Sequence, residues 1–179
     1  MTGATTTDIF LSEHGSDSSN CKDIETACRT LRRAMQIAGV GHAVVYIEAT
    51  TRSTASSWLC REDIVHVLGS VTIKPRPPAL KGSARLGCGA GGSDGVRRVL
   101  MFNVTGSGAT RHEVPSLTLD GLTVEGAILQ VRDGHLALVE TTLIDVTLVS
   151  TYADHVRLDV VNSTWTSRYP HNVTTCEVR

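Results

Sequence analysis

The chain has 179 residues and a formal net charge of -1. This is enough for one domain with a sizeable core, and the charge gives no reason to expect nucleic acid or an acidic membrane surface as a partner. Aromatic residues make up only 4% of the chain, and its aliphatic and β-branched residues suit strands better than helices. No stretch approaches the ~20 apolar residues of a membrane-spanning helix, so no membrane contact by this segment is expected.

The first part of the chain is predicted to form a lead-in and one short strand. Residues 1–7 are expected to be a disordered lead-in, and they lack the basic and apolar regions of a secretory signal. The sequence Asp-Ile-Phe-Leu at residues 8–11 favours a short strand. The stretch 13–20 is rich in Gly, Ser and Asp, which predicts a turn.

A capping helix is predicted over residues 27–38. Its apolar residues share one face at i, i+3, i+4 and i+7 spacing: Leu31, Ala34, Met35 and Ala38. Either Thr26 or Thr30 can act as the N-cap, and Gly39 supplies a natural C-terminal stop. Because this helix is short and amphipathic, we expect its apolar face to cover the first turn of whatever fold follows.

Short apolar runs separated by polar turns follow the helix. The clearest are residues 43–47, 64–68, 71–73 and 99–102. Runs of four or five residues that are apolar on both faces are typical of strands in parallel sheets. The Gly- and Ser-rich stretch 82–95 predicts a loop between them.

From residue 116 the sequence becomes periodic, with a phrase that recurs every ~19–22 residues. The three copies are Leu117-x-Leu119 with Thr123-Val124, Leu136-x-Leu138 with Thr142-Leu143, and Val156-x-Leu158 with Thr164-Trp165. A strand of this length cannot bury its apolar face alone, so stacking the copies makes one continuous core. We therefore expect Leu119, Leu138 and Leu158 to be neighbours.

This period favours a right-handed parallel β-helix solenoid. Ankyrin and TPR repeats need ~33–34 residues, and the leucine-rich-repeat frame with its Asn or Cys is missing. A β-sandwich is the main rival, although it does not require the phrase to recur in register. The predicted fold class is all-β: a right-handed parallel β-helix solenoid with a short N-terminal capping α-helix. It forms a single domain over residues 8–179, with coils over 43–167, as a fragment of a longer extracellular chain.

The chain contains five cysteines: Cys21, Cys28, Cys60, Cys88 and Cys176. None forms a CxxC pair, so a zinc ribbon or a thioredoxin-type motif is not indicated. Their wide spacing fits structural disulfides in an oxidising compartment. We predict the bridges Cys21–Cys28 and Cys60–Cys88 and leave Cys176 unpaired; reduced, buried cysteines are the alternative.

Three of the four asparagines open an N-x-S/T sequon: Asn103, Asn162 and Asn172. Sequons arise easily in Thr-rich sequences, but together with the cysteines they favour secretion. We therefore predict a disulfide-bonded glycoprotein that is secreted or lies on the extracellular face of the plasma membrane, with N-glycosylation at these three positions.

The motifs resemble those of one known superfamily. The residues that carry the resemblance are Gly15-Ser-Asp17 before Cys21, Cys28-Arg-Thr-Leu31, Leu117–Val124 and Leu136–Asp145. Over residues 8–167 the chain resembles the pectin-lyase-like superfamily of right-handed parallel β-helices, specifically its extracellular β-helix repeat domains. That superfamily includes polysaccharide lyases and hydrolases as well as adhesins and receptor ectodomains, so the resemblance implies the fold and leaves the function open.

The sequence contains no clear catalytic motif. Carbohydrate-cleaving β-helices use paired carboxylates, or carboxylates that hold Ca²⁺ beside an arginine. Asp120, Glu140 and Asp159 are predicted to stack on similar coil positions with Arg157 nearby, which makes these four residues candidates for a binding face. No catalytic residue and no cofactor is predicted, and the scattered histidines indicate no metal site.

The function predicted from the sequence is an extracellular or cell-surface binding or adhesion module of the receptor-ectodomain kind. Its partner would be a protein or a glycan, because the long faces of a solenoid suit broad contact. The alternative is a small or degenerate carbohydrate-active enzyme, a polysaccharide lyase or glycosidase of the pectin-lyase-like fold. Whether the carboxylates converge beside an arginine would discriminate between the two.

Overall fold

The computed structural model describes residues 5–48, 64–77, 82, 84–87, 100–105, 114–150 and 156–166. Within these ranges the protein is mostly β, with parallel sheets and one short helix. The predicted Cys60–Cys88 bridge, Cys176 and Asn172 lie outside the described residues, as do residues 1–4 of the lead-in. Thr7, the last residue of the predicted lead-in, belongs to the first strand rather than to an irregular segment.

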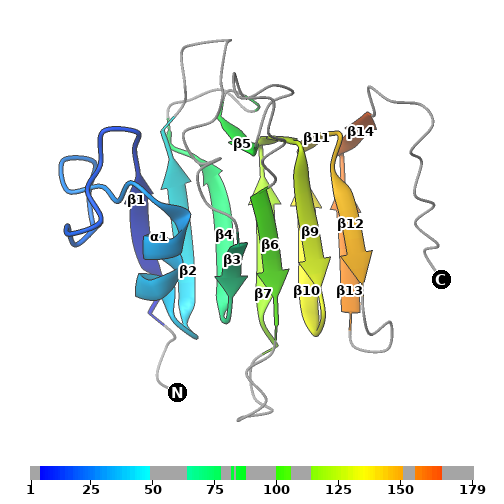
Figure 1. The fold of residues 1–179 in the computed structure, drawn as a ribbon, viewed down its shortest axis with the longest axis horizontal. Helices are drawn as coiled ribbons and strands as arrows, with labels where there is room; N and C mark the ends of the chain where they lie inside the picture. Colours follow the sequence, from blue (N-terminus) through cyan, green and yellow to red (C-terminus); the bar gives the residue numbers. More distant parts are fainter. Residues whose placement is uncertain are drawn as a thin grey trace.

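The strands form three sheets (Figure 1). Sheet A contains β1 (Thr7–Leu11), β2 (His42–Ile47), β4 (Ser70–Pro75), β7 (Ser116–Asp120), β10 (Gly134–Val139) and β13 (Val156–Val161). Sheet B contains β3 (Ile64–Val67), β6 (Leu100–Val104), β9 (Ala127–Val131) and β12 (Thr147–Ser150). Sheet C contains β5 (Arg85–Gly87), β8 (Thr123–Glu125), β11 (Thr142–Ile144) and β14 (Thr164–Thr166).

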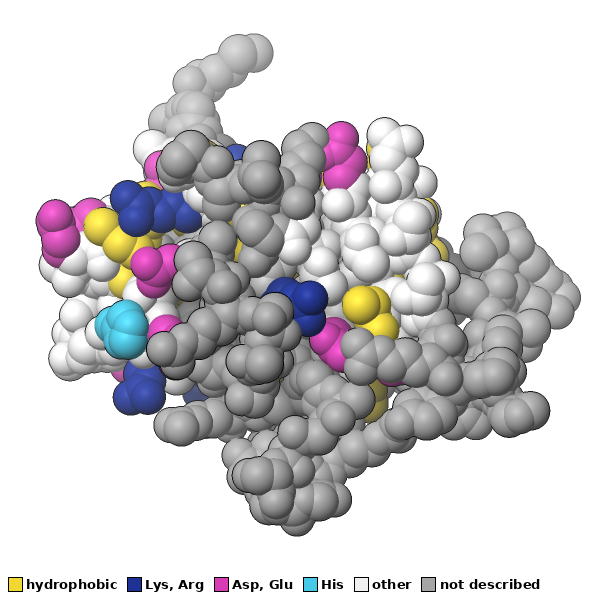
Figure 2. Space-filling view, turned by 90° about the horizontal axis from the view of Figure 1, so that it is seen from above, with side chains coloured by type: hydrophobic (Ala, Val, Ile, Leu, Met, Phe, Trp, Pro, Cys, Tyr) yellow, Lys and Arg dark blue, Asp and Glu magenta, His cyan; other side chains and the backbone are white. Residues whose placement is uncertain are grey.

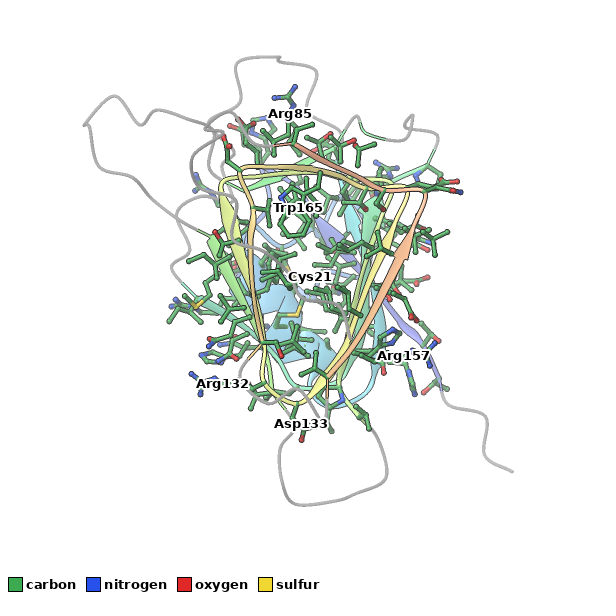
Figure 3. The ribbon with its side chains drawn as sticks, turned by 90° about the vertical axis from the view of Figure 1, so that its right-hand side faces the viewer. Cys21, Arg85, Arg132, Asp133, Arg157 and Trp165 are labelled. Atoms are coloured by element: carbon green, nitrogen blue, oxygen red, sulfur yellow. A yellow bond between two sulfur atoms is a disulfide. The ribbon has the colours of Figure 1, made fainter. Side chains whose placement is uncertain are left out.

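The chain visits the three sheets in rotation. From β4 onward it passes through sheet A, then C, then B, and we call one such passage a circuit. Each strand pairs in parallel with the strand of the same sheet in the next circuit, as β4 does with β7 and β7 with β10. Seen from the C-terminal end, the three sheets form the sides of a triangle that encloses the core (Figure 3).

The core consists of aliphatic side chains stacked from circuit to circuit. In sheet A the inward rows are Val71–Leu117–Leu136–Leu158 and Ile73–Leu119–Leu138–Val160. The residues of the first three circuits in these rows are at most 2% exposed, and burial of one such side chain stabilises the fold by about 1.5–3 kcal/mol.

The prediction that Leu119, Leu138 and Leu158 are neighbours is only partly correct. Leu119 pairs with Leu138, but Leu158 pairs with Leu136. The strand β13 is thus displaced by two residues from the predicted alignment. Because side chains alternate with a period of two, a two-residue displacement keeps the same residues inside, and the sequence pattern does not distinguish the two registers.

The corner between sheets A and C is built from residues in the left-handed conformation. Gly121, Glu140 and Asn162 each follow a sheet A strand and have φ values of 66°, 48° and 49°. The backbone N–H of Gly121 donates to Val139 and that of Glu140 donates to Val161, so the corners stack as the strands do.

The helix α1 (Leu31–Ala38) is shorter than the predicted 27–38. Residue Thr30, not Thr26, is the N-cap, and its side chain accepts a hydrogen bond from the N–H of Arg33. Cys28 pairs with Leu11 in a parallel bridge, which keeps the residues before Thr30 extended. The predicted apolar face is buried against β1, β2 and β3, and Figure 1 shows the helix at the N-terminal end of the sheets.

The segment before the helix is held by Asp17 and by a disulfide. One carboxylate oxygen of Asp17 accepts from the N–H groups of Arg29 and Thr30, at 3.0 Å each. The Cys21–Cys28 bridge is present, and both residues are fully buried. Gly15 lies so close to Cys28 that a Cβ there would be 2.3 Å from its carbonyl oxygen, which explains why this turn needs a glycine.

Candidate functional site

The outer face of sheet A is the broadest set of outward side chains that the structure describes. Because strand side chains alternate, the residues between the buried ones point outward and align in rows across the strands. One row is His42–Ser70–Ser116–His135–Arg157, and the next is Val44–Thr72–Thr118–Ala137–Asp159. Six strands at about 4.8 Å spacing make this face about 24 Å wide.

An aromatic pair lies at the N-terminal end of this face. The rings of Phe10 and Tyr46 stack with centroids 5.1 Å apart and an interplanar angle of 23°. The Nζ atom of Lys74 lies 5.2 Å from the centre of the Tyr46 ring, within the range of a cation–π contact. Rings and cation are all partly exposed, so this end offers an apolar platform beside a positive charge.

A charged cluster lies at the opposite end, on β10 and β13. Arg157 contacts both carboxylate oxygens of Asp159, with Nη2 2.9 Å from Oδ2 and Nε 3.3 Å from Oδ1. The Nε2 atom of His135 is 2.9 Å from Oδ2 of the same carboxylate. Figure 3 shows Arg157 on the outside of the sheet A wall.

The pKa of Asp159 lies below its ordinary value of 3.8, and the main cause is the hydrogen bond from Arg157. Desolvation acts in the opposite direction, and the hydrogen bond from His135 adds to the lowering. The two donors thus favour the charged form of the Asp159 carboxylate. The cluster therefore holds one anion and its basic partners in a fixed arrangement at the surface.

Hydroxyl groups lie between the two ends. The Oγ of Ser116 donates to the Oγ of Ser70 at 3.0 Å, and Thr72 pairs with Thr118 in the neighbouring row. These side chains are half-buried, short and of similar size, so the middle of the face is flat and can both donate and accept hydrogen bonds.

Two of the four predicted face residues come together and two do not. Arg157 and Asp159 form the charged cluster, but the expected stack of Asp120, Glu140 and Asp159 is wrong. Asp120 pairs with Val139, and Asp159 pairs with Ala137, while Glu140 lies in the corner after β10. The stack was predicted from a nearly constant spacing along the sequence. The turns differ in length between circuits, however, so residues at similar spacing do not lie opposite each other.

Sequence reasoning missed the role of His135. In the structure His135 is the outward residue directly opposite Arg157, and Asp159 is two residues beyond Arg157 along β13. The diagonal contact becomes visible only once the register of β10 and β13 is known.

A second candidate region is a cleft of about 560 Å³ between α1 and the outer side of β3. It is lined by Arg32, Met35, Gln36, Ile64, His66 and Leu68. The Nδ1 atom of His66 faces the Nδ2 atom of Asn103 at 3.5 Å. The cleft is lined by both apolar and polar side chains, and its lining does not indicate one class of ligand.

The outer side of sheet C carries an ion pair between Arg85 and Glu125, 3.6 Å apart, in which Glu125 is largely buried. Figure 2 looks onto this side of the molecule and shows positive and negative side chains interspersed. In that view no large patch of one charge is formed by the described residues.

Two further findings concern the described ranges only. They contain no group of three or more His, Cys, Asp or Glu residues arranged to hold a metal ion. Their helix is not long and apolar enough to cross a bilayer.

The comparisons with known proteins gave no relative. No protein-family model, no curated protein and no solved structure matches this chain.

Proposed function

We propose that the chain is an extracellular binding or adhesion module built as a right-handed parallel β-helix solenoid of the pectin-lyase-like type. The rotation of the chain through three parallel sheets supports the solenoid, as does the capping position of α1. A buried disulfide supports an oxidising, extracellular location. The partner is a protein or a glycan.

The observation that carries this proposal is the composition of the sheet A outer face. It combines a stacked aromatic pair, in-register hydroxyls and a bidentate arginine–carboxylate cluster on six paired strands. Tyrosine and arginine are the residues that most often dominate binding energy at interfaces. Because these side chains stand on paired strands rather than loops, little conformational entropy is lost when a partner binds.

The main alternative is a small or degenerate carbohydrate-active enzyme. One observation favours it: the contact between His135 and Asp159 resembles the pairs that orient a general base. In such a pair the carboxylate stays charged and the imidazole exchanges the proton, so the contact between Asp159 and Arg157 is compatible with this alternative as well.

The proposal is tested with the chain secreted from eukaryotic cells and labelled, then applied to a glycan array and to an array of extracellular protein domains. For a reproducible ligand, Arg157→Ala and Tyr46→Ala are expected to weaken binding about tenfold or more, which is the loss typical of an interface residue that carries much of the binding energy.

A matched control is Arg132→Ala, because Arg132 is also an exposed arginine but lies at the corner between sheets B and A, away from Arg157 (Figure 3). It is expected to bind as the unmodified chain does. Equal weakening by Arg132→Ala and Arg157→Ala, or no ligand on either array, would contradict the proposal. Release of oligosaccharides from a polysaccharide on incubation, lost in His135→Ala, would favour the enzyme.

A further inference from the structure

The structure separates the two described sequons by their surroundings. Asn162 is exposed in the corner between β13 and β14. Asn103 is only 8% exposed within β6, which pairs with a strand on each side. An N-linked glycan needs an asparagine side-chain nitrogen that is open to solvent in the folded protein, so the two sites cannot be equivalent.

The side chain of Asn162 is available as an acceptor. Its φ of 49° is a left-handed conformation that asparagine adopts more readily than most residues. No hydrogen bond of its side-chain amide is found among the described residues. The turn beside it is fixed instead by Ser163, whose Oγ accepts from the N–H of Thr141 and donates to the carbonyl of Val161.

The side chain of Asn103 is occupied on both atoms. Its Oδ1 accepts from the Oγ1 of Thr105 at 2.7 Å, and its Nδ2 faces His66. The register partners His66 and Gln130 lie on the two adjacent strands, about 4.8 Å away on either side. A sugar on this nitrogen would have to displace those side chains.

The position of Asn162 also places it at the exposed end of the core. Val160 and Trp165 lie on either side of it along the chain, and their register partners Leu138 and Leu143 are 1% and 2% exposed. Val160 and Trp165 themselves are 56% and 47% exposed. Figure 3 shows Trp165 within the triangle at this end.

The strands β13 and β14 are the last in their sheets, so each has one unpaired edge within the described part of the chain. An unpaired edge beside exposed apolar side chains is a template for association with another chain. A bulky, hydrated group at the corner that joins the two strands would obstruct such pairing.

We infer that Asn162 carries an N-linked glycan, that Asn103 does not, and that the glycan on Asn162 shields the exposed end of sheets A and C from self-association. The inference rests on the extracellular location within the proposed function. It does not depend on the identity of any ligand.

The test is glycan mapping of the full chain, secreted from eukaryotic cells with a heterologous signal peptide. Enzymatic release in heavy-oxygen water marks each formerly glycosylated asparagine by a mass shift. We expect the Asn162 peptide to be marked in the monomeric fraction and the Asn103 peptide to be unmarked. The mark at Asn162 should be lost in Thr164→Ala, which keeps the asparagine but destroys the sequon.

An unmarked Asn162, or a marked Asn103 in folded monomer, would overturn the assignment. Because Asn103→Gln removes a buried hydrogen-bonded side chain, Thr105→Ala serves as a second variant without that sequon. Asn103→Gln and Thr105→Ala are both expected to migrate on gels as the unmodified chain does, because no glycan is lost from Asn103.

The shielding role is measured by light scattering during size-exclusion chromatography. Asn162→Gln is expected to show a larger oligomeric fraction than the unmodified chain at equal concentration, and trimming of the glycan from the folded, unmodified chain should have the same effect. An unchanged monomer in both would overturn the shielding role. None of these readouts uses a ligand, so failure of the binding proposal and failure of this inference are distinguishable.

Discussion

Replacement of Glu140 tests whether the corners between sheets A and C require a left-handed residue. Glu140 has a φ of 48° and occupies the corner position that Gly121 holds one circuit earlier. Its backbone N–H donates to the carbonyl of Val161. The two variants to compare are Glu140→Gly and Glu140→Ala, since both remove the same side chain and any contact it makes.

The difference between these variants follows from backbone conformation alone. A residue with a Cβ pays about 1–2 kcal/mol to adopt the left-handed conformation. Glycine avoids this cost but loses about 0.5–1 kcal/mol relative to alanine, because its unfolded chain is freer. The glycine variant should therefore be more stable than the alanine variant by about 0.5–1 kcal/mol.

The measurement is urea denaturation followed by far-UV circular dichroism, with the free energy of unfolding extrapolated to water. Thr147 provides the matched control, because it is exposed within the extended strand β12. There the order should reverse, with Thr147→Gly less stable than Thr147→Ala by about 0.5–1 kcal/mol. A glycine variant at position 140 that is no more stable than the alanine variant would refute the argument.

Two further predictions concern the disulfide and the charged cluster. Replacing both Cys21 and Cys28 by alanine should lower the free energy of unfolding by about 2–3 kcal/mol in urea, because a bridge that closes so short a loop restricts the unfolded chain by that amount. Arg157→Gln should raise the pKa of Asp159 towards 3.8, measured by carboxyl NMR titration, because its main hydrogen-bond donor is lost. Since the folded pKa is lowered, the stabilisation is fully present above pH 3.8 and is lost as the pH falls through the folded pKa.

Each of these predictions has its own control. A reducing agent should destabilise the unmodified chain more than the double alanine variant, in which only the predicted Cys60–Cys88 bridge remains to be reduced. For the charged cluster, the difference in melting temperature between the unmodified chain and Arg157→Gln should be constant near neutral pH and shrink in acid. A difference that grows in acid would contradict the assignment of the lowered pKa to Arg157.

The sequence indicated most elements and the inward residues well, although the strand β5 lies within residues 82–95, which were predicted to be a loop. Alternating and i, i+3, i+4 patterns report which side chains face a core, whatever that core packs against. The apolar face of α1 and the inward leucines of β7 and β10 were therefore predictable. The choice of Thr30 over Thr26 as the N-cap was not, because it depends on the bridge between Leu11 and Cys28.

The candidate site was only partly predictable. Asp159 was named as a face candidate because of its predicted stack with Asp120 and Glu140, which is wrong, and Arg157 because it lies nearby in the sequence. The contact between Asp159 and His135, and the aromatic pair of Phe10 and Tyr46, join residues that are 24 or more positions apart in the chain. Such contacts depend on which strands are neighbours and in what register.

The amino-acid sequence by itself determined the local choices: which side of each strand faces inward, where the helix stops, and that Cys21 and Cys28 lie close enough to bond. Only the tertiary structure decided the register of β13 against β10, and with it which outward side chains meet on sheet A. The physical reason is that burial repeats every two residues along a strand, so a shift of two leaves the core equally apolar. Turn lengths and corner hydrogen bonds, which act across circuits, select between such registers.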